Sequence, residues 1–545
     1  MNAYDYIIVG AGTAGCVVAS RLASDGQTRV LLLEAGGTEQ RWWVRVPIGY
    51  GRTFNDPAVN WMYETEPEAA LGGVRSFWPR GKLVGGSGSI NAMVYARGQP
   101  SDFDDWQALG NAGWSWHDVR PVYEAIEDRS GNGSDAAGTH GALHVTDVSK
   151  AVHPLCGAYL QACQALGYNV TPDFNGPQPE GVGIYQITTR GGYRESTATA
   201  FLRPALARAG LSIRGSNLVL QVRAQVERVD FEGHRAAGVS YVQGGQRRSV
   251  RATRGVILCA GSINSPQLLQ LSGIGPGAVL QRAGVPVLFD VPAVGRNLQD
   301  HLAISYFYRT RVPTLNSQLS PWWGKARAGL QYLLTRRGPL SMSVNQGGGF
   351  IRSSPERRAP DLQLYFNPVS YTQSRERTRK MMNPDPFPAF LLCFNACRPT
   401  SRGYLEIRSA DPYAAPAIHP NYLSTEQDLA DVRVGTRLLR RLAATAPLAD
   451  VVESEMLPGA GKSTDEDLLQ DFRQRAGTVF HPVSTCVMGP DPARSVVDAR
   501  LRVHGIEALR VIDASVFPTI TSGNTNAPTA MVGAKGATMV LEDDR

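Results

Sequence analysis

Three glycines near the start of the chain have the spacing of a dinucleotide-binding turn. Gly10, Gly12 and Gly15 form a GxGxxG pattern, and Glu34 follows about 20 residues later. In such a turn the first glycine permits the tight bend, the second lets the backbone approach a pyrophosphate, and the third lets a helix pack closely on a strand. The N–H groups that open the helix would bind the anion, and the Glu34 carboxylate would accept a hydrogen bond from an adenosine ribose. An acid rather than an arginine at this position disfavours NADP.

The residues around this turn predict one βαβ unit. Residues 6–9 are a short apolar run typical of a buried parallel strand, residues 14–23 are small and apolar as in a helix that packs on a sheet, and residues 30–33 form a second buried strand ending at Glu34. A GxGxxG pattern alone is weak evidence, because ordinary glycine turns also match it. The full succession of strand, turn, helix, strand and acid favours a dinucleotide site.

Length and composition limit the classes of protein. A chain of 545 residues is too long for one ordinary domain, and 43% hydrophobic with 19% charged residues is typical of a folded globular protein. The net charge of +7 fits an anionic substrate, a membrane surface or merely a solvated basic exterior. Because Lys and Arg form no dense run, we expect no nucleic-acid partner.

The cysteines and the termini indicate a reducing compartment. Seven cysteines are scattered along the chain without CxxC pairs, so we expect reduced and mostly buried thiols and no metal site. The first residues lack a basic segment followed by an apolar core, and no window approaches eighteen uninterrupted apolar residues. The expectation is a cytoplasmic protein, with peripheral contact at the inner membrane left open.

A second glycine-rich stretch lies within residues 78–98. Its small residues leave the backbone little to bury except against a ligand, and they are Gly85, Gly86, Ser87, Gly88 and Ser89. Asn91 follows, beside apolar Ala92 and Met93. A buried amide needs a hydrogen-bond partner, and we expect a ligand to provide it.

Several ordered motifs together resemble the glucose–methanol–choline (GMC) flavin oxidoreductases over nearly the whole chain. GKLVGGSGSINAM (81–93) is similar to the first signature of that family, and GSINSPQLLQLSGIGP (261–276) to the second; GRNLQDH (295–301) and VIDASVFPT (511–519) also match. The second signature follows an apolar strand at 256–259, and we expect it to open a helix at Ser265 and Pro266.

The resemblance implies FAD as the cofactor. Glu34 would then bind the adenosine ribose, Gly85 to Asn91 the isoalloxazine and pyrophosphate, Asp513 the sugar-phosphate chain and Val222 the adenine through its backbone. The full set of cofactor residues implied in this way is Gly10, Gly12, Thr13, Ala14, Gly15, Glu34, Ala35, Gly85, Gly86, Ser87, Asn91, Ala92, Val222, Asp513, Ala514, Asn526 and Pro528. Some relatives attach the flavin to a histidine before the asparagine of the first signature, and Ile90 at this place predicts non-covalent FAD.

The fold implied is α/β: a Rossmann-like FAD-binding domain with a parallel sheet, and an interleaved α+β substrate domain built on an antiparallel sheet. The FAD-binding domain would comprise residues 1–145, 191–305 and 475–545, and the substrate domain residues 146–190 and 306–474. Within the latter, LQLYFN and YLEIR are typical of strands, whereas residues 428–442 have helical periodicity with an arginine-rich outer face.

The candidate catalytic residues lie near the C-terminus. An isolated histidine such as His481, set among apolar neighbours, is more often a core residue than a catalyst. The resemblance favours a catalytic role for His481. It implies that His481 faces the flavin, that Asn524 is its partner and that Asn526 contacts the flavin. A neutral imidazole suits acceptance of an alcohol proton near pH 7, and an amide can hold the substrate oxygen.

Two further residues, Cys486 and His301, are interpreted as structural rather than catalytic. Cys486 is the runner-up reactive group, but it has no adjacent base in the sequence and is expected to be inert packing. His301, in LQDHL, is expected to serve structure.

The function implied is oxidation of a primary alcohol to an aldehyde, as in the bacterial choline and alcohol dehydrogenase branch. The electron acceptor would be a quinone or another acceptor; an oxidase that releases hydrogen peroxide, and a non-redox relative such as a hydroxynitrile lyase or a photodecarboxylase, are the alternatives. Choline-oxidising relatives tend to carry an acid just before a Gly-Gly-Phe stretch, where this chain has Gln346. We therefore expect poor choline turnover.

Overall fold

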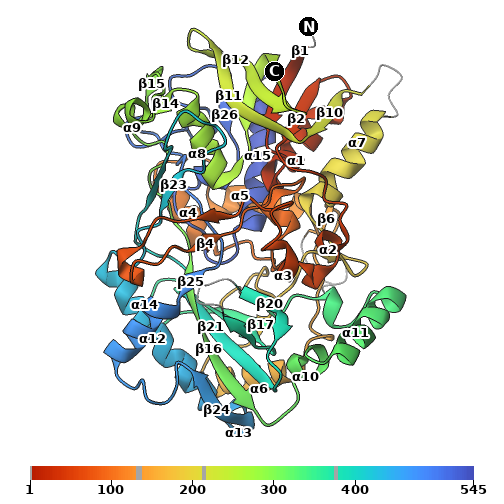
Figure 1. The fold of residues 1–545 in the computed structure, drawn as a ribbon, viewed down its shortest axis with the longest axis vertical. Helices are drawn as coiled ribbons and strands as arrows, with labels where there is room; N and C mark the ends of the chain where they lie inside the picture. The colour runs from red at the N-terminus through yellow and green to blue at the C-terminus, as the bar shows by residue number, and fades with distance from the viewer. Residues whose placement is uncertain (1–2, 130–137, 211–215, 374–378, 545) are drawn as a thin grey trace.

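A mostly parallel sheet of seven strands contains the N-terminal βαβ unit (Figure 1). The computed structural model describes residues 3–129, 138–210, 216–373 and 379–544. The strand order is β10 (Leu218–Val222), β2 (Val30–Glu34), β1 (Ala3–Val9), β13 (Gln246–Leu258), β12 (Arg235–Gln243) and β11 (Ala224–Glu232), and β26 (Leu509–Val511) also pairs with β13. The pairs of β10, β2, β1, β13 and β26 are parallel, whereas β12 and β11 extend the sheet in antiparallel fashion. Helix α1 (Thr13–Leu22) connects β1 to β2, so the predicted unit is confirmed.

A second sheet, antiparallel throughout, lies below the first in Figure 1. Its order is β24 (Val452–Leu457), β16 (Leu302–Thr310), β21 (Ala389–Ala396), β18 (Leu362–Asn367), β17 (Gly347–Ile351) and β7 (Gly181–Ile184), with β25 (Gly477–Thr478) pairing with β16. Helix α12 (Glu426–Ala443) packs on β21, and α6 (Leu155–Ala165) on β7 and β17. The predicted fold class is thus confirmed, as are the strand LQLYFN and the helix over 428–442.

The second sheet includes strands that lie partly or wholly outside the residue ranges predicted for the substrate domain, 146–190 and 306–474. Strand β16 begins at Leu302, four residues before 306, and β25 lies beyond 474. Both strands adjoin the predicted site, because His301 precedes β16 and His481 follows β25. The loops that carry these histidines are therefore fixed by neighbouring strands of one sheet.

Helix α15 (Asn526–Asp543) packs against α1. The contact is close because Gly533 has no side chain: a Cβ there would lie 3.0 Å from Cα of Ala14. This packing brings the first residue of α15 to the first turn of α1. Thr13 Oγ1 donates a hydrogen bond of 2.8 Å to Oδ1 of Asn526.

The helix of the second signature begins earlier than predicted. Helix α8 spans Gly261–Leu271, so Pro266 lies inside it and does not open it. Two side chains bond the backbone groups that lack a partner within this helix. Asp513 accepts from the N–H of Gly261. Thr485 donates to the carbonyl of Ser262, because Pro266 has no N–H to donate to it. Both partners come from distant segments, so local sequence rules place the start too late.

The described part of the chain contains ten further α-helices and six two-stranded ribbons. The helices are α2 (Trp42–Arg45), α3 (Tyr50–Thr53), α4 (Pro100–Ala108), α5 (Trp116–Ile126), α7 (Arg203–Gly210), α9 (Gly277–Arg282), α10 (Leu315–Leu319), α11 (Trp322–Thr335), α13 (Leu448–Val451) and α14 (Asp465–Arg475). Two-stranded ribbons pair β3 (Tyr63–Glu64) with β4 (Phe77–Trp78), β5 (Glu127–Asp128) with β6 (Leu143–His144), β8 (Thr189–Arg190) with β9 (Tyr193–Arg194), β14 (Ile274–Gly275) with β15 (Phe289–Asp290), β19 (Tyr371–Gln373) with β20 (Arg379–Pro384), and β22 (Tyr404–Glu406) with β23 (Ala417–His419). Across the described part of the chain, none of the helices combines the length and apolarity needed to traverse a bilayer.

Candidate active site

A long cavity opens where the parallel strands of the first sheet end, and it continues to the face of the second sheet. The carboxyl ends of β1, β2, β13 and β26 meet at one edge, because parallel strands share their direction. Ligands of open α/β sheets bind at this edge. Of the predicted site residues, the cavity lining includes Gly10, Gly12, Thr13, Ala14, Glu34, Ala35, Gly86, Ser87, Asn91, Ala92, His481, Asp513, Ala514, Asn524 and Asn526.

The first glycine turn has the geometry that its sequence predicts. Gly10 has φ of +97°, and a Cβ at this position would lie 2.6 Å from the carbonyl oxygen of Cys259. A Cβ on Gly15 would overlap the carbonyl of Gly10, so this glycine sets the distance between helix α1 and strand β1. Gly12 is the N-cap of α1 and offers no side-chain cap. The N–H groups of the first turn therefore point to the cavity without a side-chain acceptor, as an anion site requires.

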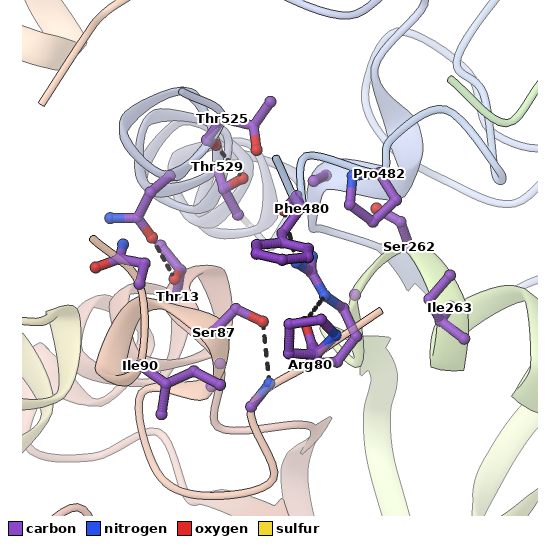
Figure 2. A pocket seen from close by; sticks show the side chains of 18 of the residues that line it. Thr13, Arg80, Ser87, Ile90, Ser262, Ile263, Phe480, Pro482, Thr525 and Thr529 are labelled. Carbon is purple, nitrogen blue, oxygen red and sulfur yellow. Dashed lines mark hydrogen bonds between the residues drawn. The ribbon is translucent and has the colours of Figure 1, made fainter. Parts of the chain in front are cut away.

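The second glycine stretch lies against this turn. Gly86 has φ of +52°, and a Cβ there would lie 2.8 Å from Cα of Gly12. The N–H of Gly85 donates to the carbonyl of Ala11 at 2.6 Å, which joins the two segments. Figure 2 shows Ser87 beside Thr13, and the Ser87 hydroxyl accepts from the N–H of Gly81 at 3.1 Å. Two backbone segments thus border one narrow groove with few side chains between them.

Two carboxylates end strands of the first sheet. Glu34 accepts hydrogen bonds from the N–H groups of Ala11 (3.0 Å) and Gly36 (2.8 Å), and burial raises its pKa. Asp513 follows β26 and accepts from Gly261 and from the Ser265 hydroxyl at 2.6 Å; burial raises its pKa too. Each carboxylate is fixed in position and keeps lone pairs that hydroxyl groups of a sugar could reach.

These features fit a dinucleotide such as FAD. The fit rests on the open N-terminus of α1, on a groove that any Cβ at Gly86 would fill, and on an acid at the end of β2. When bound, the pyrophosphate would lie at the α1 N-terminus and the ribose at Glu34. Ile90, an alkyl residue, occupies the wall where a tethering histidine would stand.

Four predicted cofactor residues stand behind the cavity wall. Gly15, Gly85 and Pro528 lie in the supporting backbone, and Val222 ends β10, where its carbonyl accepts from Nε2 of Gln243 at 3.1 Å. The wall beside Val222 is formed by Ala224, Gln225 and Val226 at the start of β11.

Asn91 lines the cavity, but its oxygen has protein partners. Its Oδ1 accepts from the N–H of Met93 at 2.9 Å and from Nη1 of Arg194 at 2.7 Å. The expectation that a ligand satisfies this amide is therefore wrong for its oxygen. Burial lowers the pKa of Arg194 to about 9, so the side chain is still a cation at neutral pH. Arg194 lies 103 positions away, and no local pattern marks it.

His481 lies in the cavity wall and contacts one residue on each side of its ring. It is 7% exposed; its Nδ1 is 3.0 Å from Nδ1 of His301, and its Nε2 is 3.1 Å from Nδ2 of Asn524. His301 is fully buried, and its Nε2 is 2.9 Å from the carbonyl oxygen of Cys397. The structural role expected for His301 therefore includes a direct contact with the candidate base.

The partners of His301 assign the tautomers of both rings. A carbonyl only accepts, so Nε2 of His301 carries a proton and donates to Cys397. Burial lowers the pKa of His301 to about 4, so at neutral pH its Nδ1 holds a lone pair. His481 must then donate from Nδ1, which leaves the lone pair on Nε2. That lone pair accepts from the amide of Asn524, on the cavity side.

Asn524 is itself held by a residue that sequence reasoning missed. Its Oδ1 accepts from Nε2 of Gln363 at 3.3 Å, which fixes Nδ2 as the atom facing His481. Gln363 lies on β18 and also donates to the Tyr185 hydroxyl. A buried glutamine in an apolar strand such as LQLYFN was the one signal that could have identified it.

Two charged side chains, Asp300 and Arg80, support the loop before His481. Asp300 accepts from the N–H of His481 at 2.7 Å and from the hydroxyls of Thr478 and Tyr422. Figure 2 shows Arg80 directed at Phe480, and its Nη2 donates to the Phe480 carbonyl at 2.6 Å. Phe480 has φ of +70°, a costly conformation for a bulky residue. The two charged side chains therefore hold a strained backbone that presents the imidazole.

The far end of the cavity is mainly apolar and aromatic. Its walls there include Tyr50, Phe54, Trp61, Met93, Val344, Asn345, Tyr365, Asn367, Tyr371, Leu391 and Phe480. Gln346 stands where choline-oxidising relatives tend to carry an acid, but it lies outside this lining, and its Oε1 accepts from the N–H of His153 at 2.7 Å. The preceding residue, Asn345, lies in the wall. Among the lining residues that the structure describes, Glu34 and Asp513 are the only carboxylates, both at the dinucleotide end.

The structure does not favour Cys486, the runner-up reactive group. Cys486 is buried away from the cavity lining, and burial together with Asp513 raises the pKa of its thiol well above the usual range. All seven cysteines are free and buried, as expected. Within the described ranges, no cluster of three or more His, Cys, Asp or Glu side chains could hold a metal ion.

The chain is similar to known proteins over almost its whole length. A family model described as GMC oxidoreductase matches residues 4–303, and the model for the C-terminal part of GMC oxidoreductases matches residues 399–533. Alcohol dehydrogenase [acceptor] of Pseudomonas putida is 39% identical over 99% of this chain and 96% of its own length. Mitochondrial choline dehydrogenase of Homo sapiens is 42% identical over 98% of this chain and 89% of its own length.

A solved structure shows the same fold. Pyridoxine 4-oxidase from Mesorbium loti superposes with a TM-score of 0.87 at 31% identity, covering 98% of this chain and 99% of that one. GMC oxidoreductases are FAD-dependent, in accord with the groove described above. With family models over more than half of its length and relatives near 40% identity, the chain belongs to the GMC oxidoreductase family.

Proposed function

We propose that this protein oxidises an uncharged primary alcohol to the aldehyde, with His481 as the base. The observation that carries the proposal is the hydrogen-bonded series from the Cys397 carbonyl through His301 and His481 to Asn524. It puts the lone pair of a neutral imidazole at the cavity surface, where a hydroxyl proton can be accepted. Bound FAD supplies the hydride acceptor.

Each residue of the series has a distinct task. When the substrate hydroxyl replaces the Asn524 N–H at Nε2 of His481, that nitrogen takes the O–H proton. The Nδ1–H of His481 keeps donating to His301, which stabilises the imidazolium that results. The amide of Asn524 has a second N–H and donates to the substrate oxygen as negative charge develops there. Gln363 holds that amide in orientation, and the aromatic walls exclude water from the reacting atoms.

The substrate class follows from the cavity wall. Its far end offers aromatic and aliphatic surface and two amides, and the described lining has no carboxylate near His481. A quaternary ammonium group would lose water there without gaining an anionic partner. We therefore favour an uncharged aliphatic or aromatic alcohol over choline, although choline dehydrogenases are among the relatives.

We propose that FAD is held without a covalent bond and that the protein is cytoplasmic. Ile90 supports the former because an alkyl side chain cannot form a bond to flavin, and seven free thiols support a reducing compartment. Acid precipitation should leave the yellow colour in the supernatant, whereas a flavin-bearing peptide in a mass spectrum would contradict the first point.

Anaerobic mixing with a panel of alcohols tests the proposed reaction. Bleaching of the yellow spectrum by benzyl alcohol or hexanol, with formation of the aldehyde, is expected. A flavin that stays oxidised with every alcohol would favour a non-redox relative such as a hydroxynitrile lyase or a photodecarboxylase. The proposed acceptor is a quinone or an artificial dye; hydrogen peroxide formed in step with aldehyde would instead identify an oxidase.

A further inference from the structure

Helix α11 exposes an unusually apolar surface. Its outward side chains are Trp322, Trp323, Leu330, Leu333 and Leu334, and the exposed fraction reaches 81% for Trp322 and 75% for Leu334. We call these five residues the α11 face. Over the described ranges, thirteen large hydrophobic residues are exposed, and this single helix supplies five of them. Contiguous exposed apolar surface on a protein usually marks an interaction site.

The spacing shows that the exposed face belongs to a normally docked helix. Gly324, Ala328 and Tyr332 recur every four residues and are buried against the protein. A Cβ on Gly324 would overlap the carbonyl of Gln318 in α10, so the helix lies tightly on its neighbour. The face opposite this row would be polar in an ordinary surface helix, whereas here it carries tryptophan and leucine.

The charged side chains of the segment that carries the α11 face all have one sign. Residues 301–355 contain no Asp or Glu, and their seven cations are Arg309, Arg311, Lys325, Arg327, Arg336, Arg337 and Arg352. On and next to α11, the exposed side chains of Lys325, Arg327 and Arg337 have no salt bridge to any described residue. An apolar strip with basic flanks is the pattern of helices that lie in the interface of an anionic bilayer.

A neighbouring segment continues the same surface. Trp42, at the start of α2, is 45% exposed and packs edge-on against Tyr332 with ring centroids 6.2 Å apart. Figure 1 shows α11 at the margin of the molecule, with α2 and α3 above it and α10 beside it. A third tryptophan is thus added at the rim, and this residue type prefers the headgroup region of bilayers.

We propose that the α11 face, with Trp42, docks this protein on an anionic lipid bilayer. The apolar side chains would enter the boundary between headgroups and acyl chains, and Lys325, Arg327 and Arg337 would contact lipid phosphates. A second copy of the chain fits less well, because a twofold contact would set these cations against their own counterparts. The proposal does not depend on which substrate is oxidised.

Docking would also place one wall of the cavity near the bilayer. The chain leads from α11 to Val344 and Asn345 of that wall, where the N–H of Val344 donates to the Tyr50 hydroxyl at 3.1 Å. Leu315 of α10 packs in the same cluster as Tyr50 and Val344. The surface that meets lipid and the wall that surrounds the reacting group are therefore parts of one packed unit.

Flotation of the purified holoenzyme with lipid vesicles tests the proposal. Wild type should float with equimolar phosphatidylglycerol and phosphatidylcholine, and much less with phosphatidylcholine alone. The triple variant W322S/L330S/L334S should lose at least about tenfold in vesicle partition. The neutralised variant K325Q/R327Q/R337Q should lose about 100-fold on anionic vesicles, from about fivefold per cation.

Matched controls separate docking from misfolding. V287S/L288S removes exposed apolar side chains outside the α11 face and should float like wild type. All three variants should keep full FAD occupancy and wild-type turnover with a soluble dye acceptor. The proposal is overturned if wild type stays unbound, or if the face variants bind anionic vesicles as tightly as wild type. It is also overturned if light scattering shows a wild-type dimer that the triple variant converts to monomer, because a second copy would then cover the face.

Discussion

Nδ1 of His301 lies 3.0 Å from Nδ1 of His481, and the first ring determines which nitrogen of the second carries the proton. Because the Nε2–H of His301 donates to the Cys397 carbonyl, the remaining lone pair of that ring, on Nδ1, accepts from His481. The lone pair that we propose as the acceptor of a substrate proton therefore faces the cavity.

Replacing His301 with leucine should slow flavin reduction by alcohol about 10- to 1,000-fold, because His481 can then adopt the other tautomer. His301→Gln keeps both a donor and an acceptor and should recover part of the loss. Stopped-flow reduction and its pH profile distinguish a tautomer effect from a general packing effect. The control is His504→Gln, whose ring bonds to Ser495 and Gly489 away from the cavity. Equal rates for the leucine and glutamine variants would argue against the tautomer explanation.

The buried state of His301 should also appear in the dependence of stability on pH. Its pKa is about 4 in the folded protein, against about 6.5 when unfolded, so folding favours the neutral ring. The unfolded chain then binds more protons between these values, and stability falls as the pH drops from 6.5 towards 4. The full difference is roughly 3 kcal/mol.

Thermal unfolding of wild type and of His301→Gln across this range measures that contribution. The melting temperature of wild type should fall more steeply on acidification, because glutamine does not titrate. Titratable groups that do not contact His301 are common to both proteins and cancel in the difference. Parallel curves from pH 7 to 4.5 would mean that His301 is not held neutral by burial.

The cavity wall predicts how specificity could be redirected. Asn345→Asp would add an anion to the described lining near the aromatic end and should raise kcat/KM for choline about tenfold relative to benzyl alcohol. Gln346→Glu is the matched control, because that side chain bonds to the N–H of His153 and faces away from the cavity. It should lower stability without improving choline turnover. An equal gain from both variants would contradict the assignment of the wall.

This pair of residues also shows how far sequence reasoning reaches. The strand, turn and helix around Gly10 were predicted because each depends on neighbours a few residues away. Neighbouring extended residues direct their side chains to opposite sides. The side chain at position 345 therefore faces the cavity, whereas the side chain at position 346 faces the protein core. The contact of His301 with His481 spans 180 positions, and no local pattern encodes such a pairing. The start of α8 was misplaced for the same reason, since Asp513 and Thr485 are remote from it.

The decisive prediction concerns His481 and Asn524. His481→Ala should keep FAD bound, because the groove at Gly12, Gly86 and Glu34 is formed by other elements, yet should slow flavin reduction about 100- to 10,000-fold. Asn524→Ala should cost less, about 10- to 1,000-fold, since it removes one hydrogen bond to the developing charge and leaves the base in place.

Both variants must be compared by stopped-flow reduction under anaerobic conditions, because slow reoxidation could conceal a large change in the chemical step. In wild type the rate should fall as acidification protonates His481, since an imidazolium cannot accept the alcohol proton, and this limb of the profile should be absent from His481→Ala. A variant with full FAD occupancy and a near wild-type rate would show that His481 is a wall residue only. In that case the lone pair on Nε2, which the contacts of His301 direct to the cavity, would have to serve binding rather than proton transfer.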